Sequence, residues 1–324
     1  MASKALCPAT LAIVQAVRAS WPEDEVFVGC SGGADSLALA FAAARVARER
    51  GGTVTALIVD HGLQPGSAAV AAGVAGRVAA FGAHPRVQRV EVTGPGGMEA
   101  AAREARYQAF TEAAGQTGSV LLGHTLDDQA ETVLLGLARG SGLRSLAGMA
   151  PVRGIFVRPL LGIRSATTSQ ACEELGLVVV EDPHNADPTF ARVRVRRTVL
   201  PLLEDQLGGG IAEALARTAT LARADADALD ALAVTELARL RREEPDVPGL
   251  SPRELAALAP AVATRVLRLW LLANGAGQLG AEHVTAVWAL VADWHGQKGV
   301  DLPGLRVIRQ DGRLQAVPRS QVSY

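Results

Sequence analysis

The first half of the chain alternates short apolar, β-prone runs with longer helical stretches, and this alternation constrains the fold more than any other feature. The predicted strands cover residues 25–29, 53–59, 87–92 and 119–123. The predicted helices that follow them cover residues 36–45, 67–81, 98–114 and 126–138. Such an order indicates βαβ units and a parallel sheet covered on both faces. We therefore predict an α/β domain whose ligands bind beyond the carboxyl ends of its strands.

The character of the chain changes after the three glycines at 208–210. Long Ala-, Leu- and Arg-rich segments predict helices over 211–240, 251–274 and 281–294, with a proline-marked break at 244–248. The tail, residues 305–317, alternates around Asp311-Gly312, which is typical of a β-hairpin. A chain of 324 residues suits about two domains. We predict an α/β domain over residues 1–207 and a smaller, mainly helical domain with a terminal hairpin over 211–324.

Composition excludes several classes of protein. No apolar run approaches the ~20 residues of a membrane span, and the N-terminus lacks the features of a signal peptide, so a cytoplasmic protein is expected. The three cysteines are isolated, which argues against a zinc site or an iron–sulfur cluster. The net charge of −1 neither demands nor excludes a nucleic-acid partner. Aromatic residues make up only 4%, which argues against extensive stacking on bases.

A serine- and glycine-rich loop lies between the first predicted strand and its helix. Backbone N–H groups at a helix N-terminus bind phosphate, and glycines let the backbone approach the phosphate oxygens. Asp35 would repel phosphate unless a divalent cation lies between them, so its presence implies Mg²⁺ held by Asp35. The plainer alternative is a glycine turn in which Ser31 or Asp35 caps the helix. The residues predicted to bind ATP are Ser31, Gly32, Gly33, Ala34, Asp35 and Ser36.

Two further segments contain candidate ligand-binding residues, but each segment alone is weak evidence for a site. His61 follows Asp60 at the end of the second predicted strand, where it binds ATP or is an ordinary turn residue. Arg103 and Arg106 are three residues apart, so they share one face of a predicted helix. They are candidates for phosphate contacts, although surface arginines on a helix are usually solvated.

An acidic cluster follows the fourth predicted strand. His124 stands at the strand's end, Asp128 is four residues after it, and Asp127 and Glu131 are four apart. Carboxylates four apart on one helix face repel each other, so a metal or a positively charged substrate would make the arrangement favourable. The alternative, a helix stop with a flexible loop, explains the glycines after Arg139 but not the acids.

A basic cluster lies within residues 181–203. Its four arginines could meet RNA phosphates or the triphosphate of ATP. On a helix they would spread over more than one face, so part of the cluster is ordinary surface. Its members are Arg192, Arg194, Arg196 and Arg197.

The loop at 31–36 resembles the pyrophosphatase loop of the N-type ATP pyrophosphatases, the PP-loop superfamily of adenylating enzymes. Five further segments narrow the choice: Val-Asp-His-Gly-Leu (59–63), Glu-Ala-Ala-Ala-Arg-Glu-Ala-Arg-Tyr (99–107), His-x-x-Asp-Asp-x-x-Glu-Thr (124–132), Arg-Gly-Ser-Gly-Leu (139–143) and the stretch 181–203. Together they resemble the tRNA(Ile)-lysidine synthetase family in order and spacing across residues 25–205.

This resemblance implies that ATP adenylates C2 of the wobble cytidine in a CAU-anticodon isoleucine tRNA, and that free lysine then displaces AMP. It implies catalytic roles for a cluster of acids and a histidine, and phosphate or tRNA contacts for five arginines. The implied catalytic residues are Asp35, His124, Asp127, Asp128 and Glu131. The implied phosphate- or tRNA-binding residues are Arg103, Arg106, Arg139, Arg192 and Arg196.

One departure from the family is the valine at 193, where the family's Arg-Asn-x-Ile-Arg-like element has asparagine. The chain's end at 324 fits a short form of the family. Three alternatives remain open: a PP-loop enzyme that adds sulfur to tRNA, an amidotransferase-like synthetase, and a nucleotide-dependent RNA-binding module without catalysis. The isolated cysteines argue against the first. The second would need ammonia, normally from a glutaminase domain, and the sequence shows neither an N-terminal nucleophile cysteine nor a second catalytic half. A homodimer is an option that the residues leave open.

Overall fold

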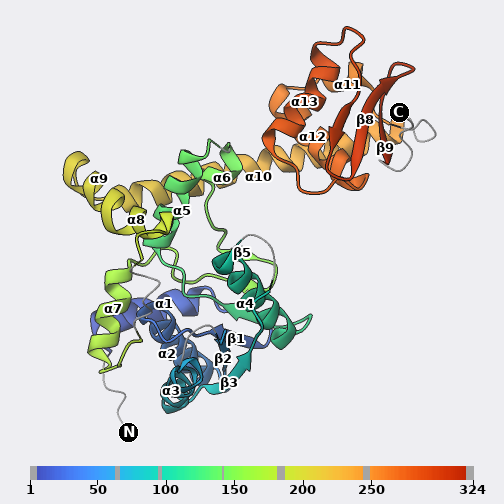
Figure 1. Ribbon diagram of the computed structural model, residues 1–324. Coiled ribbons are helices and arrows are strands. Elements are labelled where there is room, and N and C mark those ends of the chain that lie inside the picture. Colours follow the sequence, from blue (N-terminus) through green and yellow to red (C-terminus); the bar gives the residue numbers. More distant parts are fainter. Residues whose placement is uncertain are drawn as a thin grey trace. The chain divides into compact units, whose positions relative to one another are not determined.

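The computed structural model describes residues 6–62, 66–93, 97–140, 142–180, 187–243 and 249–318. The chain divides into two compact units, Met1–Thr220 and Leu221–Tyr324 (Figure 1). The proline-marked break at 244–248, and parts of the motifs at 63, 141 and 181–186, lie outside the described residues. Within the described residues, no helix combines the length and apolar character that crossing a membrane requires.

A six-stranded sheet forms the centre of the first unit, with strand order β3-β2-β1-β4-β6-β5. All neighbouring strands pair in parallel except β5, which runs antiparallel to β6. The predicted parallel α/β fold is therefore confirmed. The strands are β1 (Val26–Gly29), β2 (Thr55–Asp60), β3 (His84–Arg89), β4 (Ser119–Leu121), β5 (Val152–Arg153) and β6 (Phe156–Val157).

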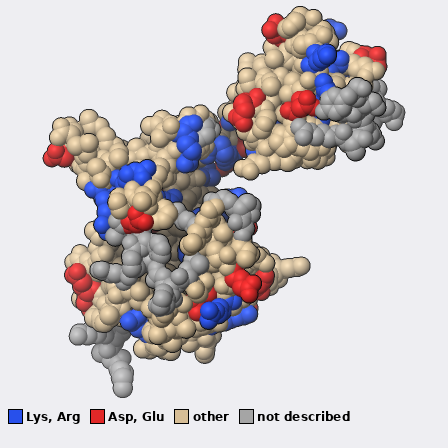
Figure 2. All heavy atoms as spheres, in the orientation of Figure 1, with Lys and Arg blue, Asp and Glu red and all other residues tan. Residues whose placement is uncertain are grey.

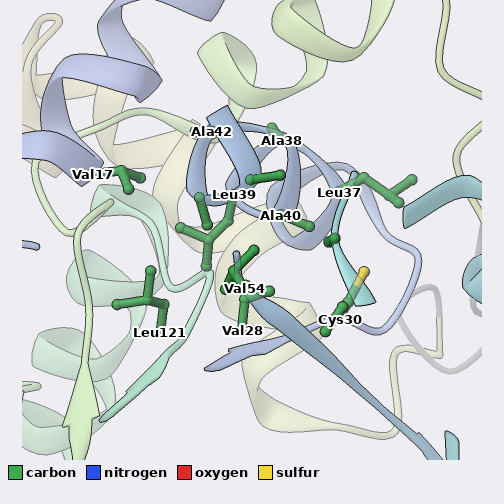
Figure 3. Packing of buried hydrophobic residues seen from close by; sticks show 14 of the residues in the cluster. Val17, Val28, Cys30, Leu37, Ala38, Leu39, Ala40, Ala42, Val54 and Leu121 are labelled. Carbon is green, nitrogen blue, oxygen red and sulfur yellow. The ribbon is translucent and has the colours of Figure 1, made fainter. Parts of the chain in front are cut away.

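Alternate side chains of β1, β2, β4 and β6 enter different cores on the two faces of the sheet. Val26 and Val28 pack with helices on one face, where Ile13, Leu37 and other apolar side chains form the larger core. Figure 3 shows Val28 and Leu37 in this core. Phe27 points to the opposite face, against Phe110. The helices of this unit are α1 (Pro8–Ala19), α2 (Ala34–Glu49), α3 (Ser67–Ala80), α4 (Met98–Ala114), α5 (Leu126–Ala138), α6 (Leu143–Leu146), α7 (Ser165–Glu174), α8 (Ala191–Arg194) and α9 (Leu200–Leu207).

The third strand lies three residues earlier than predicted, at 84–89 instead of 87–92. Thr55 pairs with His84 and Asp60 with Arg89, so the register with β2 decides its limits. Pro85 is tolerated because β3 is an edge strand. The sequence also failed to predict α1, α7 and the two-residue strands β5 and β6.

The second unit is helical with a small antiparallel sheet, as predicted. Its core packs Val266, Leu267 and Trp270 against strand residues such as Leu305. Asp311 and Gly312 both have positive φ, 50° and 75°, which is the conformation of a tight hairpin turn. The predicted helix over 251–274 is wrong in one respect: Pro260 begins a new helix after a break. The elements are α10 (Ile211–Glu243, which begins in the first unit), α11 (Pro252–Ala256), α12 (Pro260–Ala273), α13 (Ala281–Ala292), β7 (Val300–Leu302), β8 (Leu305–Gln310) and β9 (Arg313–Pro318).

Candidate active site

The loop between β1 and α2 is organised by the hydroxyl group of Ser36. Its Oγ accepts hydrogen bonds from the backbone N–H groups of Ser31 and Gly32, both at 3.1 Å, and donates to the carbonyl of Gly33 at 3.0 Å. The N-cap residue of α2 is Gly33, and no side chain caps the helix. The alternative in which Ser31 or Asp35 caps α2 is therefore wrong. The first turn of α2 presents the uncapped helix N-terminus that phosphate binding requires.

Glycine is required at position 32 for two reasons. Its φ is +89°, and a Cβ atom there would lie 2.6 Å from Cγ2 of Val74 and 3.0 Å from Cγ2 of Val180. Val180 also donates its N–H to the carbonyl of Gly32 at 2.9 Å. Gly123, after β4, is similarly close to α2, since its Cβ would lie 3.1 Å from the carbonyl of Asp35. The loop is thus packed tightly from three sides.

Asp35, in the first turn of α2, carries a carboxylate in an unfavourable environment. Burial raises the pKa of Asp35 to about 6, and the nearby charges of Asp128 and Asp127 act in the same direction. A hydrogen bond from the Thr168 hydroxyl to Oδ1, and the charge of Arg196, partly oppose this rise in pKa. The acids predicted to act together are therefore close enough to influence one another.

The end of β2 contributes Asp60 and His61. The carboxylate of Asp60 is buried and accepts the N–H of Gly62 at 2.9 Å, which shapes the turn. Hydrogen bonds, first of all with Ser67, lower the pKa of Asp60. The ring Nε2 of His61 lies 3.2 Å from Nη2 of Arg106, a residue of α4. Two side chains that the sequence could not connect are therefore in contact.

His124 lies just beyond β4. Burial lowers the pKa of His124 to about 4, and the positive charges of Arg158, Arg103 and Arg192 add to this effect against the opposing charge of Asp128. The ring is therefore neutral at neutral pH. Its Nδ1 is buried and has no hydrogen-bond partner among the described residues. A neutral ring with an unused nitrogen can accept or donate a proton.

Asp128 stabilises the start of α5 and also faces a cation. One carboxylate oxygen, Oδ2, accepts the backbone N–H of Thr125 at 2.9 Å, while the Asp128 N–H donates to the Thr125 hydroxyl at 3.4 Å. This reciprocal arrangement is a capping box. The other oxygen, Oδ1, accepts a hydrogen bond from Arg196 at 2.7 Å.

Glu131 is fully buried and pairs with the basic segment. Arg196 donates to its two oxygens at 2.5 and 3.1 Å, and Nε of Arg192 lies 3.6 Å from Oε2. Burial raises the pKa of Glu131, and the Arg196 guanidinium opposes that rise. Arginine cannot lose its proton in a protein, so the pair is ionic.

Asp127 faces a different arginine. Its Oδ2 accepts the backbone N–H of Ser165 at 2.7 Å, at the start of α7, and its Oδ1 lies 3.0 Å from Nη2 of Arg164. Arg164 also pairs with Glu213 at 2.8 Å. Arginines of this chain therefore supply the positive charge that offsets the repulsion among the acids of α5. From the sequence, a metal or a cationic substrate was expected to supply it.

The remaining predicted arginines lie toward the surface. Arg103 is exposed and its guanidinium lies 4.9 Å from the ring centroid of Tyr107. Arg139 is exposed at the C-cap of α5, and its side chain has no hydrogen bond or ion pair with the described part of the chain. Figure 2 shows Lys and Arg side chains gathered over the elements labelled α6 and α8 in Figure 1. Charge of this sign suits a polyanionic partner.

A π-helical turn, Val195–Val199, carries Arg196 and interrupts the helix between α8 and α9. Pro201 has no N–H for the carbonyl of Arg197, and its ring would clash with that carbonyl in an α-helix. The wider turn, in which the N–H of Leu200 donates to the carbonyl of Val195, avoids this conflict. Val193 is buried, so the position that has asparagine in the family's pattern is occupied here by an apolar core side chain.

The described residues contain no group of three or more His, Cys, Asp or Glu side chains arranged to hold a metal ion. Mg²⁺ commonly binds one or two carboxylates together with substrate phosphates, so one carboxylate is a sufficient protein contribution. Asp35 fits this requirement, because its oxygens are hard donors and a divalent cation would relieve the unfavourable burial of its charge.

Four polar residues of the site were not predicted. Thr168 contacts Asp35, Arg164 pairs with Asp127, and Arg158 influences His124. Gln129 is buried and exchanges two hydrogen bonds with the backbone of Met149, at 2.7 and 3.0 Å. In the sequence, only the position of Gln129 between Asp128 and Glu131 in the acidic motif could have indicated that it belongs to the site.

Comparison with known proteins gives consistent matches. A PP-loop domain model matches residues 10–203, and a TilS substrate binding domain model matches residues 250–315. A tRNA(Ile)-lysidine synthase of Leifsonia xyli is 54% identical over 299 residues, which cover 91% of this chain and 90% of that protein. A tRNA(Ile)-lysidine synthase of Rhodococcus jostii is 55% identical over 318 residues, 95% of each chain.

Among solved structures, the U34-tRNA thiolase NcsA from Methanococcus maripaludis, with its 4Fe-4S cluster, superposes with a TM-score of 0.52 at 17% identity. The match covers 65% of this chain and 78% of that chain. At this level of identity the similarity shows a shared fold alone.

Proposed function

Because this chain belongs to the tRNA(Ile)-lysidine synthase family, we propose that it joins free lysine to C2 of the wobble cytidine in the CAU-anticodon isoleucine tRNA at the expense of ATP. One observation carries this proposal. The first turn of α7 bonds both motifs: the Thr168 hydroxyl donates to Asp35, and the Ser165 N–H donates to Asp127. The phosphate loop and the acidic motif therefore belong to one site. A nucleotide bound at the loop would therefore meet the groups that handle the second substrate.

In the first step, the C2 oxygen of the cytidine attacks the α-phosphorus of ATP. An O–P bond forms, the bond between the α- and β-phosphates breaks, and pyrophosphate leaves. The backbone N–H groups of the loop held by Ser36 would bind phosphate oxygens. Arg103 and Arg106 on α4 would contact the leaving pyrophosphate or tRNA phosphates. Bound Mg²⁺, held by Asp35, would supply neutralisation of the charge that develops on the pyrophosphate.

In the second step, the ε-amine of lysine attacks C2, and the bond from C2 to the adenylate oxygen breaks to release AMP. An amine with a pKa of ~10.4 must lose a proton before it attacks. We assign the acceptance of this proton to a carboxylate of the acidic motif or to His124, whose buried Nδ1 has no hydrogen-bond partner among the described residues. Asp127, Asp128 and Glu131 would provide the negative field that attracts the lysine ammonium.

We assign adenylation to residues 1–207 and tRNA recognition to residues 211–324. The match of a substrate binding domain model to residues 250–315 supports the second assignment. The exposed Arg139 would contact tRNA phosphates, because its side chain has no partner among the described residues. Arg192 and Arg196, which pair with Glu131, would contact tRNA phosphates or the triphosphate through donors that this pairing leaves over. A homodimer is compatible with these assignments, and its test is the molar mass in solution.

The decisive experiment incubates the full chain with ATP, Mg²⁺, radiolabelled lysine and unmodified isoleucine CAU tRNA. We expect label in acid-insoluble RNA, with AMP and pyrophosphate released in equal amounts. Release of pyrophosphate without labelled RNA would keep the adenylation step and refute lysine as the nucleophile. Binding of ATP without any cleavage would refute catalysis and favour a nucleotide-dependent RNA-binding module. Methionine CAU tRNA serves as the matched control and should remain unlabelled.

A further inference from the structure

Arg158 is a buried arginine at the carboxyl end of a parallel strand. It directly follows β6 and is 6% exposed. The N–H of Leu122 donates to the carbonyl of Val157 at 2.8 Å, so the segments that follow β4 and β6 continue side by side. Ligands of parallel α/β sheets bind at this edge, where the loop at 31–36 and His124 also lie.

The guanidinium of Arg158 has little to compensate its charge. Nη1 donates to the carbonyl of Ala150 at 2.8 Å, while Nε is buried without a hydrogen-bond partner. No carboxylate forms an ion pair with it in the part of the chain that the structure describes. Buried charges are normally paired, because the cost of removing them from water is high. An arginine in this state has several donors left for an anion.

The position of Arg158 in the sheet indicates which anion it binds. The strand order places β4 between β1, which carries the phosphate loop, and β6. Neighbouring strands are about 4.8 Å apart, so the loop and Arg158 start from strands about 10 Å apart. In the proposed function the loop binds the phosphates that leave, and Arg158 follows a strand on the other side of β4, the strand that precedes His124. The charge of Arg158 also reaches His124, a candidate proton acceptor.

We propose that Arg158 binds the α-phosphoryl group of ATP, and that it keeps this group when the nucleotide has become the adenylate on the tRNA. The inference rests on the proposed function and adds a substrate-binding residue to it. Arg158 neutralises the phosphoryl oxygens in both steps, because the same phosphorus is attacked in the first step and leaves with AMP in the second. It does not hold the β- and γ-phosphates.

The test measures binding of ATP, AMP and pyrophosphate to the full chain by titration calorimetry, without tRNA. Arg158→Gln keeps an N–H donor for the Ala150 carbonyl but removes the charge. We expect this variant to lower the affinities for ATP and AMP by the same factor, about ten- to a hundred-fold. This factor corresponds to the loss of one charge-assisted hydrogen bond. Affinity for pyrophosphate should stay unchanged. Arg153→Gln, on the adjacent strand β5 and exposed, is the control and should leave all three affinities unchanged.

Arg158→Lys separates a binding role from a structural one. It keeps the charge, so we expect a smaller loss for ATP and AMP than in Arg158→Gln, again without an effect on pyrophosphate. Equal affinities in the wild type and both variants would overturn the inference. A loss of affinity for pyrophosphate alone would also overturn it. If Arg158→Lys and Arg158→Gln lower the affinities for ATP and AMP equally, with a matching fall in melting temperature, Arg158 has a structural role and the inference is overturned. If the wild type itself fails to bind ATP, the proposed function fails first.

Discussion

Arg196 reaches the fully buried carboxylate of Glu131 across 65 positions of sequence and donates hydrogen bonds to both of its oxygens. The same guanidinium bonds Asp128 at 2.7 Å. One cation therefore joins the acidic motif of α5 to the basic segment that follows α8. The two motifs that the sequence presents as separate signals form a single electrostatic unit.

Replacing Glu131 by glutamine should destabilise the fold, because it leaves Arg196 and Arg192 without their buried counter-charge. Loss of one partner of a buried pair costs about 3–5 kcal/mol, and we expect roughly 1–3 kcal/mol here since Arg196 is 43% exposed. Urea unfolding measures the difference. Glu173→Gln, an exposed acid on α7, is the control and should change the free energy of unfolding by less than about 0.5 kcal/mol. Equal stability of the two variants would contradict this account.

Asp35→Asn should abolish ATP cleavage yet stabilise the protein at pH 8 in the absence of metal and ATP. Because the pKa of Asp35 rises from 3.8 to about 6 on folding, the folded state binds more protons than the unfolded state between these values. Wild-type stability therefore falls as the pH rises through this window, by roughly 1–3 kcal/mol. The variant lacks this loss, so the two proteins should have similar stability below about pH 4, separate between pH 4 and pH 6, and keep a constant difference above pH 6. Thermal unfolding across pH 3.5–8 tests the sign, and a less stable variant at pH 8 would refute it.

Gly32→Ala and Gly33→Ala should differ sharply although the two glycines are neighbours. Position 32 combines φ of +89° with contacts of 2.6 and 3.0 Å to valine methyl groups, so the alanine variant should lose about 2 kcal/mol or more. At position 33, φ is −71° and the nearest side-chain atom, Oγ of Ser31, would lie 3.8 Å from a new Cβ. We expect Gly33→Ala to fold with near-wild-type stability in the same urea titration. Equal losses at both positions would show that the loop is not packed as described.

Asp128→Asn should abolish lysidine formation with only a modest loss of stability, since asparagine can still accept the Thr125 N–H at the start of α5. The expected defect comes from the lost charge opposite Arg196 and beside His124. Thr125→Ala is the matched control: it damages the capping box by about 1 kcal/mol and leaves the charge in place. Turnover in the labelled-lysine assay should fail in the first variant and persist in the second. Near-normal turnover by Asp128→Asn would remove Asp128 from the catalytic set.

Features with strong local signals could be predicted from the sequence. The βαβ alternation identified the parallel sheet, and the hairpin at Asp311-Gly312 follows from residues that tolerate positive φ. The site residues with the clearest motifs, Asp35 and Asp128, lie close enough for their charges to interact. Their catalytic roles stay predictions.

Other features depend on contacts that no local pattern records. Strands β5 and β6 have two residues each, so they show no periodicity. Their existence depends on the pairing of β6 with β4 and of β5 with β6. Arg158 is an arginine in an apolar stretch, and its burial follows from that unpredicted strand. Arg164 pairs with Asp127, 37 positions earlier in the chain, and only the packing of α5 near the start of α7 brings the two together.

The π turn before Pro201 has a consequence for the angular phase of the helix that carries Arg196. A π turn takes up more residues than an α turn, so every side chain on one side of it is rotated about the helix axis relative to the other side. The direction in which Arg196 points is therefore encoded partly by a proline five residues away that touches neither Glu131 nor Asp128 by any hydrogen bond or ion pair in the described chain. A residue far from the reacting atoms can thus set the orientation of the Arg196 side chain without contacting its partners.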